Sequence, residues 1–561
     1  MSELPEGLQV YDVKYLPIVR AYAQKIGLVE EINRQVDSEM EISPGTFVLA
    51  MVLDTLSGRS PLYRLQDFFA HQDVELLLGE DHCPQAFHDD NAGRVLDKIY
   101  QAGSMKLFTS CALRACEVFG VEGPYFHFDS TTRSVMGEYL LEEQHDLPFV
   151  PTYGYSKDKR PDLKQFVLST LCVNHNVPIL GSFEDGNASD KKLNNELLNR
   201  LSEHLGNKDL EQTIYIADSA VVTEKNLAAL EQQLFITRLP ASYKECGRVI
   251  EEAVEAQEWE EVGVLAKTPG SVKRPCAHYR VYESQVKLYG KKYRAVVVHS
   301  SSNDKRRQKR LEREQKASLK EVLQVVKQQS PQEYACEADA QAAAQRLRDS
   351  RWGYHRLAVE VEQRPTYGKG RPPKDRPRPV KELRYGLRVS IQQREKVLER
   401  KRMSAGCFVL LTSVPTDGEL GHAGVQVLQA YKEQHGLEQN YGFLKDPVII
   451  NSLYLKRPER LEALGLVLLL ALLIWRLMER TMRAHVNEQH SPLVGLDNKD
   501  TKRPTSFMMT TKFTCVMVAK VGQERRLVSP FSKVQRSYLV ALGVRVEAFT
   551  HFELRLQQDG W

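Results

Sequence analysis

The first part of the chain carries apolar residues at the spacing of amphipathic helices. They recur every three or four positions in residues 17–32, 46–56 and 92–103, and Ser, Gly and Asn lie between these segments. This pattern predicts an all-helical N-terminal region over residues 1–120.

From residue 121 the pattern changes to short runs of β-branched and aromatic residues. Helical spacing separates the later runs, in residues 189–205 and 223–233. Strands that alternate with helices are typical of an α/β sheet. We therefore expect the first part of an α/β domain at residues 121–240, with five strands. The predicted strands are residues 125–129, 165–173, 177–183, 213–218 and 234–239.

The sheet pattern stops after Leu239 and resumes only at residues 406–413. A gap of about 165 residues is too long for a loop inside a compact domain, so it predicts an inserted module at residues 241–404. Its segments are strand-like over 278–300, helical and charged over 304–328, and a Pro/Arg linker, which excludes a regular helix, over 364–379.

The second part of the α/β domain is expected at residues 405–490, followed by a C-terminal tail region at 491–561. The most apolar stretch, Leu464 to Trp475, is about 12 residues long, whereas a membrane-spanning helix needs about 20. A buried core helix explains it better, and no membrane partner is expected. The nine cysteines form no Cys-x-x-Cys pair, and the first residues do not resemble a signal peptide, so a cytoplasmic location is expected.

Composition first suggests an ordinary globular chain, with 42% hydrophobic residues, 27% charged residues and a net charge of only +4. The charge is segregated, however. Residues 1–120 hold 10 Lys and Arg against 18 Asp and Glu, whereas residues 304–327 hold 9 against 4 and residues 364–402 hold 14 against 4. Such basic clusters favour a polyanionic partner, because each neutralised phosphate releases counterions. A solvated helix face and a flexible linker are the alternative.

Two predicted strands close on an aspartate, in FHFDSTT at Asp129 and in YIADSAVVT at Asp218. Ligands gather at strand carboxyl ends in open α/β sheets, and two converging carboxylates suit Mg²⁺. The alternative is that each Asp caps the following turn or helix, as Asp218 could do for a helix that begins near Thr223.

A third acidic candidate follows the insertion, in QAYKEQHGLEQNYGFLKDP. At about 100° per residue, Tyr431, Gln434, Glu438 and Lys445 would share one helix face about 60° wide. A polar, solvated helix face is the alternative, and two glycines in the segment weaken a regular helix.

Taken in order, these features resemble the DDE transposases of bacterial insertion sequences. The resemblance is to the group whose last signature reads Tyr, two residues, Arg, three residues, Glu, six residues, Lys. Tyr431, Glu438 and Lys445 meet this spacing, and Gln434 stands where Arg is usual. The segments around Asp129 and Asp218, and GYSKDKRPDLKQ at residues 154–165, also resemble landmarks of that group.

The resemblance implies a ribonuclease-H-like fold, with a mixed five-stranded sheet and a largely β insertion before the helix that carries the Glu. It implies that Asp129, Asp218 and Glu438 are catalytic and hold two Mg²⁺ ions, for which Mn²⁺ can substitute. Tyr431, Gln434 and Lys445 would position the DNA end.

The implied activity is metal-dependent cleavage at insertion-sequence ends, followed by strand transfer of the 3′-hydroxyl into target DNA. The expected partners are double-stranded DNA, as terminal inverted repeats and target, and a second copy of the chain in the active complex, which would associate with the nucleoid. The N-terminal region would serve self-association or end binding. The expected backbone contacts are Lys305, Arg306, Arg307, Arg371 and Lys374. Two alternatives remain open, namely a ribonuclease-H-like nuclease without strand transfer and a non-catalytic DNA-binding protein derived from a transposase.

Overall fold

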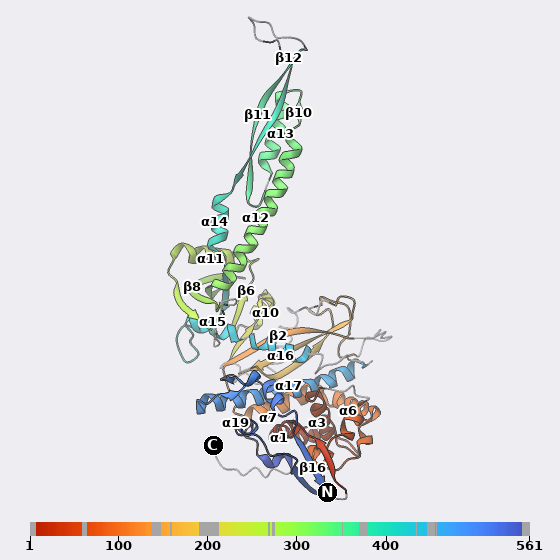
Figure 1. Ribbon diagram of the computed structural model, residues 1–561. Coiled ribbons are helices and arrows are strands. Elements are labelled where there is room, and N and C mark those ends of the chain that lie inside the picture. The colour runs from red at the N-terminus through yellow and green to blue at the C-terminus, as the bar shows by residue number, and fades with distance from the viewer. Residues whose placement is uncertain are drawn as a thin grey trace. The chain divides into compact units, whose positions relative to one another are not determined.

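The structure is a computed structural model of the 561-residue chain, and its elements are labelled in Figure 1. It describes residues 7–58, 64–135, 147–156, 160–174, 176–189, 213–266, 270–271, 275–350, 352–369, 378, 380–433, 435–445, 455 and 457–552, without the side chains of residues 435–438. The chain divides into two compact units. One joins the residues up to Thr237 to those from Ala430 onward, and the other is Arg238–Gln429.

The N-terminal region of the first unit is helical, as the sequence predicts. Its longer helices begin and end at local signals: Ser43 caps α3 through a hydrogen bond from the Thr46 amide, and Gly27 separates α1 from α2 at a φ of 71°. The helices are α1 Leu16–Ile26, α2 Leu28–Gln35, α3 Pro44–Leu56, α4 Leu65–Ala70, α5 Val74–Leu78, α6 Asp89–Ala102 and α7 Ser104–Val118.

The next part of the first unit is formed by five adjacent strands, in the order β4-β3-β2-β5-β6, of a mixed sheet that has nine strands rather than the expected five. β3 pairs antiparallel with both β2 and β4, whereas β5 pairs parallel with both β2 and β6. The strands are β2 Tyr125–Ser134, β3 Gln165–Val173, β4 Val177–Glu184, β5 Ile214–Ala217 and β6 Leu234–Leu239, so all five predicted strands are confirmed. The protein is therefore a mixed α/β protein with a helical N-terminal region.

A single long helix, α17 Pro458–Gln489, lies between this sheet and the N-terminal helices (Figure 1). Gly465 lets the helix approach β4 closely, since a Cβ atom there would overlap the Phe183 ring. By length and composition α17 could cross a membrane, but 89% of its most apolar 18-residue window is buried inside the protein. That burial is typical of a core helix. The N-terminal helices, α17 and the sheet thus form three packed layers.

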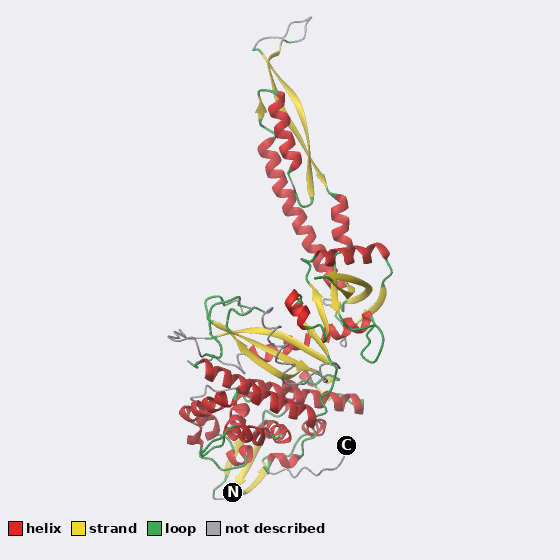
Figure 2. Ribbon diagram, turned by 180° about the vertical axis from the view of Figure 1, so that it is seen from behind, coloured by secondary structure: helices red, strands yellow, loops and turns green. Residues whose placement is uncertain are grey.

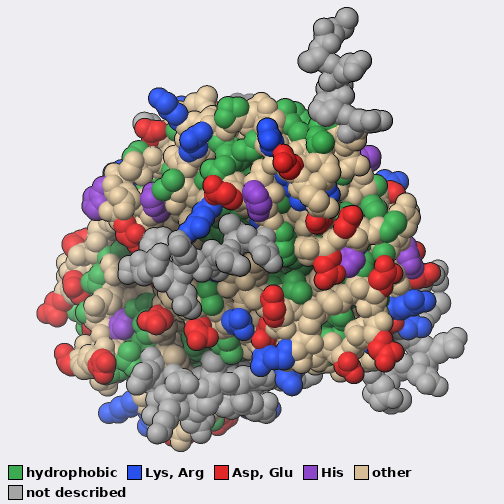
Figure 3. Space-filling model, turned by 90° about the horizontal axis from the view of Figure 1, so that it is seen from below, with side chains coloured by type: hydrophobic (Ala, Val, Ile, Leu, Met, Phe, Trp, Pro, Cys, Tyr) green, Lys and Arg blue, Asp and Glu red, His purple; other side chains and the backbone are tan. Residues whose placement is uncertain are grey.

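The expected C-terminal tail region is folded onto the N-terminal helices. β16 Met517–Val521 pairs with both β17 Glu524–Leu527 and β1 Gln9–Asp12, so the two ends of the chain share a sheet. The other strands and α-helices of this region are β14 Leu493–Val494, β15 Asp500–Thr501, α18 Ser506–Lys512 and α19 Lys533–Leu542. Acidic, basic and apolar side chains are interspersed on the face of the first unit shown in Figure 3.

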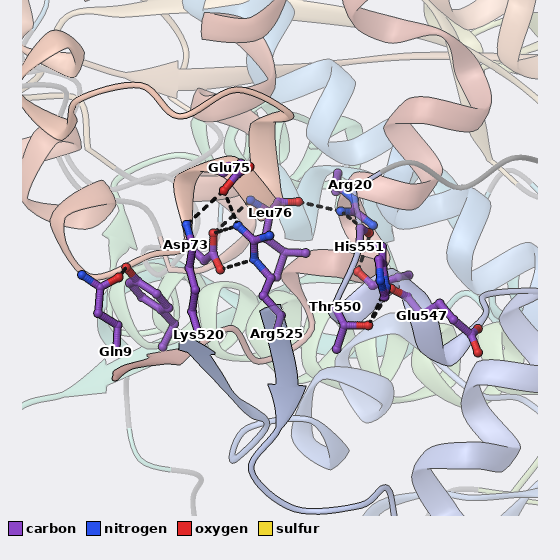
Figure 4. A network of polar contacts seen from close by, with 12 residues as sticks. Gln9, Arg20, Asp73, Glu75, Leu76, Lys520, Arg525, Glu547, Thr550 and His551 are labelled. Atoms are coloured by element: carbon purple, nitrogen blue, oxygen red, sulfur yellow. Dashed lines mark hydrogen bonds and ion pairs between the residues drawn. The ribbon is translucent and has the colours of Figure 1, made fainter. Parts of the chain in front are cut away.

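Buried charges join these two ends (Figure 4). Arg525 on β17 contacts Asp73 at 2.6 Å and Glu75 at 2.7 Å, and Lys520 on β16 contacts Glu75 at 3.0 Å. Arg20 of α1 donates to the carbonyls of Leu76 and, near the C-terminus, Ala548 and His551. No local pattern in the sequence predicts this pairing, because Asp73 and Arg525 lie 452 residues apart in the chain.

The second unit is mixed rather than largely β, which corrects the expectation for the insertion. Its helices pack beside its strands, and the 29-residue α12 runs along the β11–β12 hairpin (Figure 2). The helices are α11 Lys244–Ala256, α12 Ser301–Gln329, α13 Glu337–Asp349 and α14 Glu395–Met403. The strands are β7 Glu260–Val264, β8 His278–Leu288, β9 Lys291–Ser300, β10 Glu333–Tyr334, β11 His355–Tyr367, β12 Val380–Gln393 and β13 Cys407–Thr412. The largely β expectation came from the family resemblance, whereas the sequence itself predicts the charged helix at residues 304–328, which is confirmed as part of α12.

Candidate active site

The register of the parallel strands brings the two predicted aspartates to neighbouring positions. Tyr125 pairs with Ile214 and His127 with Ile216. Continuing this register by two residues places Asp129 beside Asp218, on strands that lie about 4.8 Å apart. The sequence suggested that Asp129 ends its strand, but it does not. β2 continues to Ser134 because it stays paired with β3, and Asp129 lies where its parallel neighbour β5 stops.

The electrostatics of Tyr215 agree with this juxtaposition. Its ring is buried on β5, and its pKa is raised well above the usual value, first by burial and then by the carboxylates of Asp218 and Asp129. Both carboxylates therefore lie near one tyrosine. Asp129 also contributes to the raised pKa of Cys172, which burial lifts to about 12.

Local hydrogen bonds orient each aspartate. Oδ1 of Asp129 accepts from the Ser130 amide at 2.8 Å, and Oδ1 of Asp218 accepts from the Ala220 amide at 3.0 Å. Asp218 thus caps the short 3-10 helix Ser219–Val221, whereas Thr223 caps α10 Glu224–Ala229. The capping alternative is borne out for the 3-10 helix and not for the helix near Thr223. Capping by one oxygen is compatible with metal binding by a carboxylate.

The third acidic candidate lies in a helical segment that covers the same part of the sheet. Tyr431 is in α15 Gly424–Glu433, whereas Glu438 and Lys445 are in α16 His435–Lys445. Gln434 lies outside the described residues, as does the side chain of Glu438. The shared helix face therefore stays a prediction. Lys445 ends α16 and lines a cavity of about 20 Å³, which has room for roughly one water molecule.

α16 packs against β2 at Asp129 through Tyr441. The hydroxyl of Tyr441 donates to the backbone carbonyl of Asp129 and lies 3.0 Å from Oγ1 of Thr170, which pairs with Asp129 across β2 and β3. Sequence reasoning missed Tyr441 and its neighbour Asn440, because nothing in their spacing shows that both are buried.

His127 lies two residues before Asp129 and so faces the same side of β2. It is 3% exposed, and burial lowers its pKa to about 4. Its Nδ1 has no hydrogen-bond partner within the described residues. The imidazole is therefore neutral at physiological pH and adds no positive charge beside Asp129.

The donor set at this edge of the sheet fits a divalent cation. The two carboxylates lie on adjacent strands and are hard oxygen ligands. The helix α16, which carries Glu438, packs over β2, the strand that carries Asp129. Asp129 and Asp218, with Glu438, are thus the residues that could hold Mg²⁺.

The predicted backbone contacts lie in the second unit. Lys305, Arg306 and Arg307 are exposed on α12, and Arg371 and Lys374 lie outside the described residues. A groove of about 520 Å³ separates α11, α12 and α14, and its cationic lining residues are Arg307, Arg310, Arg400 and Lys401. Arg310 pairs with Glu314 and Lys401 lies over the Tyr354 ring, whereas Arg307 and Arg400 form no ion pair with any described residue.

Residues 8–113 match a family described as a domain of unknown function, DUF4277, which is found in transposase-like proteins. The match covers the N-terminal helices from β1 to α7 and ends before β2. Among curated proteins, no sequence matches this chain.

Proposed function

We propose that this protein is a DNA transposase of the DDE type, with a ribonuclease-H-like catalytic sheet. The observation that carries the proposal is the parallel register that places Asp129 beside Asp218. The strand order, with three antiparallel strands followed by two parallel ones, and the packing of α16 over β2 support the same assignment. The DUF4277 match at the N-terminus supports the transposase part of the proposal, because this domain is found in transposase-like proteins.

In this proposal Asp129, Asp218 and Glu438 hold two Mg²⁺ ions through their carboxylates. The bound ions would activate a water or a 3′-hydroxyl and stabilise the leaving oxygen of an in-line phosphoryl transfer. The carboxylates act as ligands and need no role as a base. Tyr431, Gln434 and Lys445 position the DNA end, and Lys445 contributes a point charge to a phosphate.

Strand transfer separates the proposed function from its two alternatives. We incubate the protein with a duplex that carries the terminal repeat and with a supercoiled target, in Mg²⁺ or in EDTA. A transposase gives both cleaved ends and joined products in Mg²⁺ only. A nuclease gives cleavage without joined products, and a non-catalytic derivative gives neither. The repeat is taken from the DNA that flanks the gene.

The groove of the second unit is the proposed contact to the DNA backbone. We expect Arg307→Ala to lower the slope of log affinity against log salt by about 0.9, because one phosphate contact releases about that many counterions. Fluorescence anisotropy over a salt series measures the slope for labelled duplex DNA.

Lys327→Ala is the matched control for this variant. Lys327 is an exposed cation on the same helix, about 30 Å from Arg307 at 1.5 Å per residue. Its slope should stay at the wild-type value. Equal slopes for Arg307→Ala and the wild type would remove the groove from the DNA path.

A further inference from the structure

Polar side chains are buried between α16 and α17, in a region that is otherwise apolar. Arg476 is 7% exposed and Glu479 is 3% exposed, although both lie on the helix that forms the apolar centre of the first unit. They form an ion pair with each other, and Arg483 also pairs with Glu479. Because these charged side chains are buried, they do not contribute to the solubility of the protein.

Asn440 connects this ion pair to α16. Its side chain is fully buried, and its Oδ1 accepts from Nε of Arg476 at 2.6 Å. Its Nδ2 donates to the carbonyl of Asn176 at 2.8 Å and lies 3.3 Å from Sγ of Cys172. The amide therefore joins three parts of the fold: α17, the turn between β3 and β4, and β3 itself.

The next residue of α16 reaches the strand that carries the first aspartate. Tyr441 contacts the Asp129 carbonyl and Thr170, as described above. Two successive residues thus fix both the rotation of α16 and its position along its axis. The position of Glu438 lies three residues before Tyr441, and positions three apart share a side of a helix. Any displacement of α16 therefore moves the backbone of Glu438 relative to Asp129.

Stability alone does not account for these groups. Replacing a buried ion pair by apolar residues of similar volume is often neutral or stabilising, whereas hydrogen-bonded polar groups fix one arrangement. An apolar contact would let α16 slide or rotate over β2, while the three hydrogen bonds of Asn440 are satisfied in a single pose.

We infer that Asn440, Arg476 and Glu479 are positioning residues that hold α16, and with it Glu438, in register with Asp129. The inference rests on the proposed function, since it names what orders the metal-binding carboxylates. These residues do not contact the substrate. They act by holding α16 in its position.

Asn440→Leu tests the inference, because it removes all hydrogen bonds of the amide at nearly constant volume. We expect the Mg²⁺ concentration for half-maximal cleavage to rise about tenfold, the size typical of losing a residue that orients metal ligands. Affinity for end DNA should stay unchanged. Hydrogen exchange of α16 without metal should become about tenfold faster, which is a readout independent of activity.

Gln439→Leu is the matched control, since Gln439 is exposed on the same helix and undergoes the same substitution. It should keep the wild-type Mg²⁺ dependence and exchange rate. If Asn440→Leu does not fold, as judged by circular dichroism, Arg476→Lys takes its place. That variant retains the charge beside Glu479 but loses the Nε donor to Asn440, and we expect the same direction of change.

A folded variant with the wild-type Mg²⁺ dependence and the wild-type exchange rate of α16 overturns the inference. Asp129→Asn separates this outcome from failure of the proposed function. If Asp129→Asn abolishes cleavage while Asn440→Leu changes nothing, only the positioning role fails. If the wild type does not cleave, the proposed function fails, and the exchange of α16 still decides whether Asn440 orders the helix.

Discussion

Asp129→Asn and Asp218→Asn are each expected to reduce metal-dependent cleavage of an end-containing duplex by about 10³-fold. Metal ions stabilise transition-state charge by several kcal/mol, and each 1.36 kcal/mol corresponds to a factor of ten in rate. An amide keeps the shape of the side chain but removes the charge that attracts the cation. End binding should stay within about twofold of the wild type, because DNA affinity comes mainly from cationic contacts.

Asp67→Asn is the matched control for these variants, since Asp67 is an exposed aspartate on α4. It should cleave at the wild-type rate. Cleavage is measured by the appearance of nicked strands on denaturing gels, over a range of Mg²⁺ concentrations. Wild-type rates for either Asp129→Asn or Asp218→Asn would show that the two aspartates cap turns and hold no catalytic metal.

Arg525→Met is expected to destabilise the first unit by about 3–5 kcal/mol, because it leaves a buried carboxylate without its partner. The side chains of Arg525 and Asp73 are 7% and 1% exposed, and the hydrogen bond to Asp73 is the main reason that the pKa of Arg525 is raised. Urea unfolding of the full chain, followed by tryptophan fluorescence and circular dichroism, measures the loss.

The next residue on β17 supplies the control. Arg526 pairs with Glu524 at the surface, where the two side chains are 84% and 77% exposed. Arg526→Met should change the unfolding free energy by no more than about 0.5 kcal/mol, because such pairs are screened by water. Adding Asp73→Asn to Arg525→Met should recover part of the loss. Equal stability of the two arginine variants would mean that the Arg525 network is not part of the cooperative core.

Local patterns predicted the elements whose partners are near in the chain. The β-branched runs gave all five strands of the first sheet, and the matching sequence contexts of Asp129 and Asp218 identified two carboxylates that the register brings together. The resemblance to a family added Glu438 and Lys445, which periodicity alone left undecided.

Other features depend on contacts that no local pattern encodes. The apolar run at Leu464–Trp475 predicted about one third of α17, because the charged residues that follow it look solvated in sequence. Arg476 and Glu479 are in fact buried, since they satisfy each other and Asn440. The pairing of β1 with β16 joins residues about 500 positions apart, a distance at which periodicity carries no information.

The last strands of the first unit supply partners to its N-terminal helices, so the time at which they are synthesised limits when this unit can finish folding. Arg525 follows Asp73 by 452 residues. At about 5–20 residues per second, a ribosome needs roughly 25–90 s to supply that partner after it has made Asp73. During this time the nascent N-terminal helices lack the counter-charges of Asp73 and Glu75, and for most of it they also lack α17, the helix against which they pack. The first unit therefore completes its buried charge network only after Arg525 has been synthesised.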